Sequence, residues 1–281
     1  MDSNNLNVGF IGGGNMSTAI FKGIIKNESH PPSKIWVSGP HTEKLKYWSE
    51  MGANVTNVNG NVLDTCDMIF LGVKVNKLND VISSFRNAKN ISSERTITFV
   101  SMLAGVKLEK IEKSIKAYYP NSNFGFIRIM PNTPITVGSG ICLYTSGQLP
   151  NNGGKTLNKL ILLLRGSAVL QNVPESYMDS LGALTACGPA YMYLVIEALA
   201  DGAVKQGVPR DMAIRHAAEM VVGSGQMVLQ SGKHPGQLKD EVCSPGGSTI
   251  CGIAELENGK LRATLINAIE ASTKKNQDLG I

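Results

Sequence analysis

The sequence predicts an α/β protein with a doubly wound parallel sheet in its N-terminal part and an all-α C-terminal part. Three observations support this fold class. Short β-branched runs alternate with amphipathic stretches up to about Thr145, the strand pattern then fades, and a glycine triplet directly follows the first strand-like run. The 281 residues are enough for two packed domains, because a domain commonly holds ~100–200 residues.

The expected strands are short and rich in β-branched or aromatic residues. They are Asn7–Ile11, Ile35–Val37, Met68–Leu71, Thr96–Val100, Gly125–Met130 and Gly140–Tyr144. The stretches between them repeat apolar residues at the helical period, as the crossovers of βαβ units do. These expected helices are Asn15–Lys26, Thr42–Met51, Lys77–Arg86 and Leu108–Ala117.

After about Asn151 the sequence becomes helical, apart from a short strand-like run at Ala168–Leu170. The helices expected there are Lys155–Leu164, Ser176–Ala186, Pro189–Gln206, Arg210–Gln230 and Lys260–Gln277. We place the domain boundary so that residues 1–168 form the sheet domain and residues 169–281 the helical domain. The helices Pro189–Gln206 and Arg210–Gln230 are small or apolar almost all round, so we expect the helical domain to form a homo-oligomer.

Composition and charge exclude several classes of protein. Hydrophobic residues make up 42% and charged residues 17% of the chain, as in folded globular proteins and unlike disordered or collagen-like ones. The formal net charge of +5 is scattered, so we expect no nucleic-acid partner. No apolar run approaches ~18 residues and the N-terminus is polar, so we expect neither a membrane partner nor a cleaved targeting segment.

The cysteine pattern indicates a reducing compartment. The five cysteines are odd in number, lie in apolar stretches and never form a C-x-x-C pair. We therefore expect free thiols, no zinc or other metal, and a cytoplasmic protein. A mitochondrial protein without a cleaved peptide would have the same pattern.

Glycine is in excess, with thirty residues, whereas an average share of ~7% would give about twenty. Gly12-Gly13-Gly14 follows the first strand and opens an amphipathic helix. This is the G-x-G-x-x-small turn of Rossmann dinucleotide-binding domains: Gly12 permits the bend, Gly14 lets the backbone approach a pyrophosphate, and Ser17 permits close helix–strand packing. The alternative is a glycine-rich turn that binds nothing.

The end of the second strand indicates which dinucleotide binds. NAD-binding chains usually have an acidic residue there for the ribose diol. This chain has Val37-Ser38-Gly39-Pro40-His41-Thr42, with no carboxylate to repel a 2′-phosphate. We therefore expect NADPH as the cofactor, with NADH as the open alternative because no arginine is present. Ser38 and Thr42 would otherwise be ordinary turn and helix-cap residues.

Three more stretches follow strands at the same edge of the predicted sheet. In Phe70–Lys74 and Val100–Gly105 a strand is followed by small residues, and the ribose and nicotinamide of a dinucleotide would lie against the backbone there. Lys74 either contacts the ribose or a phosphate or is an ordinary solvated lysine. In Met130–Pro134 two prolines surround an amide and a hydroxyl, and such a rigid loop would wall the nicotinamide pocket.

The helical half contains one comparable loop, Ser244-Pro245-Gly246-Gly247-Ser248-Thr249, which leads into a helix. Small residues at such a point expose several amide N–H groups together, and these form a nest for a carboxylate. Ser248 and Thr249 add hydroxyl groups to it. The alternative is a loop and helix cap without a ligand.

Several motifs, in their order along the chain, resemble those of the Δ1-pyrroline-5-carboxylate reductases, which catalyse the last step of proline synthesis. They are G-F-I-G-G-G-N-M, F-L-G-V-K, M-P-N-T-P, G-P-A-Y, H-P-G-Q-L-K-D and S-P-G-G-S-T. The similarity runs from about Asn7 to Gln277. The last motifs are specific to the family, whereas the first is shared by Rossmann dehydrogenases in general.

The resemblance implies hydride transfer from NAD(P)H to the C=N carbon of 1-pyrroline-5-carboxylate, which gives L-proline. The resemblance implies that the pyrophosphate is held by Gly12, Gly13, Gly14, Asn15 and Met16. The resemblance implies that Ser38 and Gly39 face the 2′-phosphate. It implies that the remaining cofactor path is lined by Asn59, Val73, Lys74 and Ala104. The resemblance implies that the substrate carboxylate is bound by the backbone N–H groups of Gly246, Gly247, Ser248 and Thr249. It implies that the Thr249 hydroxyl is the catalytic group and hydrogen-bonds to the ring nitrogen. Family members form interlocked dimers through the helical half, often assembled into a decamer.

The chain departs from some relatives at three positions. Gly39 replaces a serine that faces the 2′-phosphate, Gly232 a glutamate near the substrate, and Glu241 an asparagine near the cofactor, so we assign no role to the last two. A cyclic imine takes up a proton from solvent and then accepts hydride readily, so the reaction needs no Ser-His-Asp or Cys-His constellation. Positioning of the two reactants would be the main contribution of the protein, and we name no general acid.

Two other functions compete with this one. A β-hydroxyacid dehydrogenase uses a lysine and an asparagine one helical turn apart, and Lys155 and Asn158 have that spacing, although they stand too early in the chain. A non-catalytic NAD(P)-sensing protein would need the first glycine loop but not Ser244–Thr249.

Overall fold

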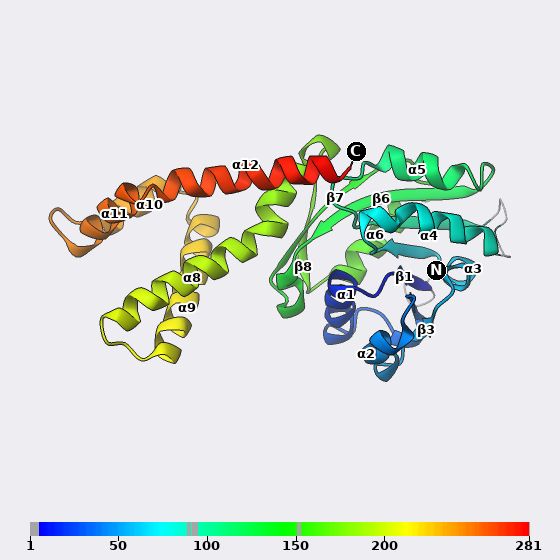
Figure 1. The fold of residues 1–281 in the computed structure, drawn as a ribbon, viewed down its shortest axis with the longest axis horizontal. Coiled ribbons are helices and arrows are strands. Elements are labelled where there is room, and N and C mark those ends of the chain that lie inside the picture. The colour runs from blue at the N-terminus through cyan, green and yellow to red at the C-terminus, as the bar shows by residue number, and fades with distance from the viewer. Residues whose placement is uncertain (1–5, 89–90, 92–94, 151–152, 281) are drawn as a thin grey trace. The chain divides into compact units, whose positions relative to one another are not determined.

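The computed structural model describes residues 6–88, 91, 95–150 and 153–280. The chain divides into two compact units, one formed by Met1–Cys187 and Ser272–Ile281 and the other by Gly188–Ala271. The first unit is built on a β-sheet with helices on both faces, and the second is helical throughout (Figure 1). The predicted fold class, a Rossmann-like sheet followed by a helical region, is confirmed.

The first unit contains one eight-stranded sheet with the order β3-β2-β1-β4-β5-β6-β7-β8. Its strands are β1 (Val8–Ile11), β2 (Ile35–Ser38), β3 (Asn54–Thr56), β4 (Met68–Leu71), β5 (Thr96–Ser101), β6 (Asn123–Pro131), β7 (Gly140–Ser146) and β8 (Ala168–Asn172). Strands β1 to β6 are parallel, as predicted for all of them except β3, which was not expected from the sequence. Strand β7 is antiparallel to β6, and β8 is parallel to β7. The wholly parallel sheet expected from the sequence was therefore wrong at β7. Residues 132–139 alone connect β6 to β7, and a parallel crossover needs a dozen or more residues.

Each face of the sheet is covered by its own set of helices, and each face has its own hydrophobic core. The helices of this unit that precede β8 are α1 (Asn15–Lys26), α2 (Lys46–Glu50), α3 (Asn59–Thr65), α4 (Leu78–Ser84), α5 (Leu108–Lys116) and α6 (Gly153–Leu164). One core joins α1, α2 and α6 to strand residues such as Phe10, and the other joins α3, α4 and α5 to residues such as Ile11. Because Phe10 and Ile11 are neighbours on β1, the strand is buried on both faces, as parallel strands usually are.

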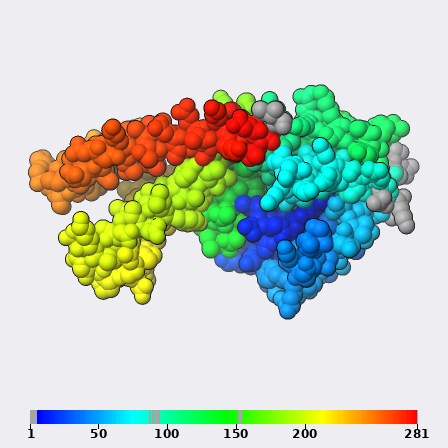
Figure 2. Space-filling model, in the orientation of Figure 1, coloured from blue at the N-terminus to red at the C-terminus, as the bar shows by residue number. Residues whose placement is uncertain are grey.

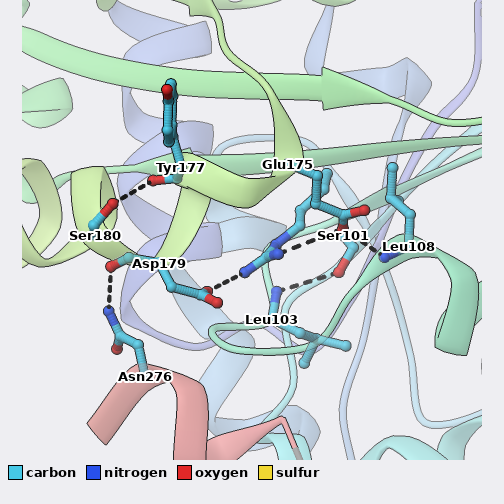
Figure 3. Close-up of polar contacts among 9 residues, drawn as sticks. Ser101, Leu103, Leu108, Glu175, Tyr177, Asp179, Ser180 and Asn276 are labelled. Atoms are coloured by element: carbon cyan, nitrogen blue, oxygen red, sulfur yellow. Dashed lines mark hydrogen bonds and ion pairs between the residues drawn. The ribbon is translucent and has the colours of Figure 1, made fainter. Parts of the chain in front are cut away.

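A buried arginine fixes the chain segment that follows β8. Arg128 on β6 is fully buried, and its guanidinium lies 2.7 Å from Asp179 and 3.4 Å from Glu175. Asp179 belongs to α7 (Met178–Gly182), and Glu175 also accepts a hydrogen bond of 2.7 Å from the Leu108 N–H at the start of α5. Figure 3 shows both carboxylates turned toward this cluster, together with Asn276, whose side chain donates to the Asp179 carbonyl.

These contacts explain why the first unit extends past residue 168, where the sequence analysis placed its end. Strand β8 pairs with β7, and α7 is held by Arg128, so residues 169–187 stay with the sheet. The last residues return to the same unit near the end of α12 (Leu261–Leu279). Asn276 contacts α7, and the Lys110 ammonium donates to the Gly280 carbonyl at 3.0 Å. Single-residue polar contacts of this kind leave no periodic pattern in a sequence.

The second unit has almost no core of its own. It consists of α8 (Gly188–Lys205), α9 (Arg210–Ser231), α10 (Pro235–Val242), α11 (Ser248–Asn258) and the first part of α12. Its buried hydrophobic residues are the small Ala200, Ala213 and Ala217. Large apolar side chains are exposed instead, many of them on α8 and α9, and Figure 2 shows these helices, in yellow-green and yellow, at the surface. An apolar surface of this extent marks an interaction site.

Among the described residues, one helical stretch, Glu175–Lys205, is long and apolar enough to cross a membrane, whereas no such stretch was expected from the sequence. Its most apolar 18-residue window has a mean hydropathy of 1.4, and 11% of that window is buried. It contains a π-helical turn at Ala183–Cys187, directly before Gly188-Pro189 at the start of α8. Length and composition alone do not separate a membrane span from a helix whose apolar surface is covered by protein.

Replacement of Arg128 tests the buried ion-pair cluster. We expect Arg128→Gln to lower the free energy of unfolding by ~3–5 kcal/mol, because Glu175 and Asp179 would lose their cation in a largely buried place. Urea denaturation followed by circular dichroism measures this change. The matched control is Lys113→Gln, which breaks an exposed pair with Glu109 and should change the free energy by less than ~1 kcal/mol. Equal effects of the two variants would contradict this role of Arg128.

Candidate active site

The glycine turn after β1 is enforced by close contacts inside the protein. Gly12 has φ +96°, and a Cβ there would lie 2.7 Å from the Gly72 carbonyl oxygen. A Cβ at Gly13 would lie 2.2 Å from a methyl group of Leu45. Gly12 therefore requires glycine whether or not a ligand binds, because its backbone is left-handed and the clash is with backbone, whereas a side chain at position 13 would require Leu45 to move.

Gly14 differs, because the protein leaves room for a side chain there. A Cβ at Gly14 would have only one neighbour within 4 Å, the Gly72 oxygen at 3.9 Å. Gly14 is exposed and is the N-cap of α1, so it offers no side chain to the first N–H groups of Asn15 and Met16. Those N–H groups have no partner inside the helix. An open glycine before an uncapped helix leaves space for an anion at the positive end of the helix dipole.

Gly72 completes this turn from the neighbouring strand, although no role of its own was expected for it from the sequence. A Cβ at Gly72 would lie 2.2 Å from the Ser17 hydroxyl and 2.8 Å from the Met102 Cε atom. The Gly72 N–H donates to the Ile11 carbonyl at 2.9 Å, so the β1–β4 pairing continues into the loop. The motif Phe70-Leu71-Gly72 contained the signal for this contact, a glycine directly after a buried strand.

The remaining cofactor positions follow the carboxyl ends of neighbouring strands. Ser38 ends β2, Val73 and Lys74 follow β4, and Ala104 follows β5, and the order β2-β1-β4-β5 brings these ends side by side with the glycine turn. Lys74 is exposed, whereas Val73 and Ala104 are half-buried. Carboxyl ends of parallel strands at the point where the strand order reverses are the usual ligand-binding edge of such sheets.

Ser38 is placed differently from the expectation that it faces a phosphate. It is fully buried, and its hydroxyl donates to the Asn59 Oδ1 atom at 2.7 Å. The Asn59 Nδ2 atom in turn donates to Ser84 on α4 at 2.9 Å. The two side chains thus link β2, α3 and α4, and the Ser38 hydroxyl is already engaged.

Gly39 offers little more to a phosphate in this conformation, because its N–H donates to the Thr56 carbonyl at 3.2 Å. A Cβ at Gly39 would make an ordinary contact with Leu45 at 3.4 Å, so packing leaves room for the serine of some relatives. The exposed residues at this edge are Pro40, His41 and Thr42, and His41 lies 3.2 Å from the Glu43 carboxylate.

The loop after β6 is fixed by the side chain of Asn132, which is buried. Its Nδ2 atom donates to the Thr185 carbonyl at 2.9 Å, and its Oδ1 atom accepts from the Ile141 N–H at 2.9 Å. An α-helix would pair the Thr185 carbonyl with the N–H of residue 189, but that residue is a proline and has none. Asn132 therefore supplies the hydrogen bond that Pro189 cannot. The loop expected to be rigid is thus joined by this amide both to strand β7 and to the turn at Thr185.

The loop Ser244–Thr249 in the second unit repeats the arrangement found at Gly14. Gly246 has φ +66°, and Gly247 is the N-cap of α11, so the first N–H groups of that helix have no side-chain cap. A Cβ at Gly247 would lie 2.4 Å from the Ser244 hydroxyl and 3.2 Å from the Ser244 carbonyl oxygen, so a side chain there would require Ser244 to shift. Ser248 is exposed and Thr249 is half-buried, and neither hydroxyl has a hydrogen-bond partner among the described residues.

Two positions without an assigned role have ordinary structural explanations. Gly232 has φ +68° and ends α9 as its C-cap, where a left-handed residue is common. Glu241 accepts hydrogen bonds from the Lys233 ammonium at 2.8 and 2.9 Å, and this interaction lowers the pKa of its carboxyl group.

The features expected of other functions are weak in the structure. Lys155 and Asn158, which have the spacing found in β-hydroxyacid dehydrogenases, are exposed on α6. Within the described part of the chain, no group of three or more His, Cys, Asp or Glu residues is placed to hold a metal ion.

Comparison with known proteins assigns both parts of the chain. Residues 7–105 match the family of coenzyme F420-dependent NADP oxidoreductases, and residues 175–279 match the pyrroline-5-carboxylate reductase dimerisation family. The chain is 38% identical over 274 residues to pyrroline-5-carboxylate reductase from Glycine max, which covers 97% of this chain and 95% of that relative. The chain belongs to the pyrroline-5-carboxylate reductase family.

Other members of the family are similarly close in sequence and structure. Pyrroline-5-carboxylate reductase 3 from Danio rerio is 38% identical over 275 residues, with 98% of this chain and 92% of the relative covered. The crystal structure of Plasmodium falciparum pyrroline carboxylate reductase, which has NADP bound, superposes with a TM-score of 0.86 at 29% identity and covers 99% of both chains. The resemblance inferred from the motifs is therefore confirmed.

Alanine at two positions of the glycine turn separates ligand binding from folding. We expect Gly14→Ala to fold normally, because its Cβ meets nothing closer than 3.9 Å, but to bind NADPH about tenfold more weakly or worse, because the methyl group narrows the open approach. Gly12→Ala should instead lose ~1–3 kcal/mol of stability, because its backbone is left-handed and its Cβ would clash. Thermal unfolding and fluorescence titration with NADPH measure both effects. Normal NADPH binding by a folded Gly14→Ala variant would contradict the proposed use of this turn.

Proposed function

We propose that this chain reduces the C=N bond of 1-pyrroline-5-carboxylate to give L-proline, with NADPH as the reductant. The observation that carries the proposal is the similarity to named pyrroline-5-carboxylate reductases along almost the whole chain, which includes both glycine-rich loops. The reaction needs neither a nucleophile nor a metal. A protonated cyclic imine accepts hydride without further activation, so the protein has to hold two reactants in register, and positioning of this kind supplies several kcal/mol, up to ~7–11.

We propose that the dinucleotide binds along the carboxyl ends of β2, β1, β4 and β5. The open Gly14 and the free N–H groups at the start of α1 fit a pyrophosphate, and Lys74 is exposed next to this edge. Val73 and Ala104 would line the path toward the nicotinamide, and Gly12, Gly13, Asn15 and Met16 would shape the turn itself. When bound, the reduced nicotinamide supplies the hydride. NADPH is favoured by the absence of a carboxylate at Ser38–Thr42 and by the NADP named with the Plasmodium falciparum relative.

We propose that the substrate carboxylate binds at the start of α11. Gly246 and Gly247 leave the N–H groups of Ser248 and Thr249 free of side-chain caps, and a helix N-terminus favours an anion there. The half-buried Thr249 hydroxyl would hydrogen-bond to the ring nitrogen and orient the C=N bond. Because the same loop fixes the carboxylate and the nitrogen, one face of the imine carbon is left open for hydride.

We propose that the chain is a homodimer held by its second unit and that dimers assemble further, up to a decamer. The dimerisation family matched at residues 175–279 and the exposed apolar side chains of α8 and α9 support the dimer. The decamer rests on the family resemblance alone.

We also propose a cytoplasmic location, which rests on the cysteine pattern of the sequence.

An oxidation assay with the purified protein tests this function. Addition of 1-pyrroline-5-carboxylate should lead to oxidation of NADPH, seen as a loss of absorbance at the reduced nicotinamide band, and to formation of L-proline. NADH, tested separately, should support a lower kcat/KM. Tight NADPH binding without oxidation would contradict the reductase and favour the non-catalytic NAD(P)-sensing protein.

Substitution of Thr249 tests the role of its hydroxyl. We expect Thr249→Ala to lower kcat by ~10–100-fold, because a hydrogen bond to a charged ring nitrogen contributes ~1.5–3 kcal/mol. The Kd for NADPH should stay the same, because the proposed partner of the Thr249 hydroxyl is the substrate ring and not the dinucleotide. Thr249→Ser keeps the hydroxyl and should retain most of the activity. Full activity of the alanine variant would refute the role.

A further inference from the structure

Strand β8 leaves one edge of the sheet open. It pairs with β7 on one side and is the last strand of the described sheet. The Gly140 N–H donates to the Ser167 carbonyl, and the Val173 N–H donates to the Tyr144 carbonyl. In a parallel pair the residues that bond to the neighbour alternate along the strand. The N–H and C=O groups of Ala168, Leu170 and Asn172 therefore point away from β7, toward the open edge.

This edge lacks the features by which proteins protect unpaired strands, which are short length, lysine, proline or a bulge. Strand β8 has five residues, Ala-Val-Leu-Gln-Asn, and keeps an uninterrupted register with β7. The side chain of Val169 is 64% exposed, so no described residue covers this part of the edge. The opposite edge strand, β3, has only three residues, all of them half-buried. The two edges of the sheet thus differ, and only β8 offers a template for another strand.

The open edge of β8 is complementary to itself. We propose that two copies of this chain join their sheets through an antiparallel β8–β8 pair around a two-fold axis at Leu170. Leu170 then pairs with the partner's Leu170, and Ala168 pairs with the partner's Asn172. Each pair exchanges both of its N–H···O bonds, because these are the residues whose backbone groups face outward. Val169 lies opposite the partner's Gln171, so its exposed side chain gains a neighbour.

The occupant is a second copy because this edge leads directly into the family's dimerisation region. Strand β8 ends at Asn172, and the match to that region begins at residue 175. A closed two-fold contact uses the same patch on both subunits and removes both open edges at once. The inference rests on the proposed homodimer and not on the proposed reaction. It adds a defined strand register outside the matched dimerisation region.

Cysteine cross-linking tests this register. Residues 169 and 171 face each other across the pair as a non-hydrogen-bonded position, where Cβ atoms lie ~4.5–5.5 Å apart, near the range of a disulfide. The double variant Val169→Cys/Gln171→Cys, treated with oxidised glutathione, should give a covalent dimer on a non-reducing gel, and a reductant should reverse it. Val169→Cys and Gln171→Cys alone should give little, because identical residues are diagonal and their Cα atoms lie ~7–8 Å apart. The unsubstituted protein is the control for its own five cysteines.

The outcomes of this experiment separate the inference from the reductase proposal. A covalent dimer in the double variant alone supports the register, whatever the activity. A double variant that stays monomeric on the gel, while mass photometry finds dimers, would overturn the β8 pairing and leave the reductase function untouched. Equal cross-linking of the two single variants would also overturn it, because it would require a different register.

Discussion

At the carboxyl ends of β1 and β4, Gly12 and Gly72 lie so close that a Cβ at Gly12 would be 2.7 Å from the Gly72 oxygen. This approach turns the chain sharply into α1, and it leaves Gly14 and the first N–H groups of the helix facing open space. The other expected cofactor residues follow from the same strand order, because Val73 and Ala104 stand at the next two strand ends. The candidate cofactor edge therefore depends on backbone packing more than on any polar side chain.

The candidate substrate loop uses the same device in the helical unit. Gly14 and Gly247 are both glycine N-caps in extended conformation, and each opens a helix whose first N–H groups have no side-chain cap. A pyrophosphate and a carboxylate are both anions, so one electrostatic arrangement serves both ligands. The two hydroxyls of Ser248 and Thr249 are the feature that distinguishes the second loop. The two loops would thus hold the two reactants, and the reaction would then need no Ser-His-Asp or Cys-His constellation.

Much of the fold was predictable because periodicity and glycine punctuation determine it locally. The bounds of α1 and β4 agree with the sequence-based ranges, and the glycine turn lies where expected. Strand β3 was missed because three residues, Asn-Val-Thr, are too few to show alternation. Helix α10 was missed because proline, glycine and charged residues interrupt its apolar pattern, and the helix expected after the loop Ser244–Thr249, α11, could be given no C-terminal bound. The antiparallel β7 was hidden because neither periodicity nor composition records strand direction.

The parts of the site that sequence could not supply depend on partners distant in the chain. The Ser38 hydroxyl is engaged by Asn59, which stands 21 residues further on, and the Thr185 carbonyl by Asn132, 53 residues before it.

The central claim, direct reduction of the imine, is tested most directly by isotope transfer. With NADPH deuterated at the transferred position of C4, the account predicts L-proline carrying one deuterium at C5. Unlabelled proline, or NADPH consumption without proline, would contradict it.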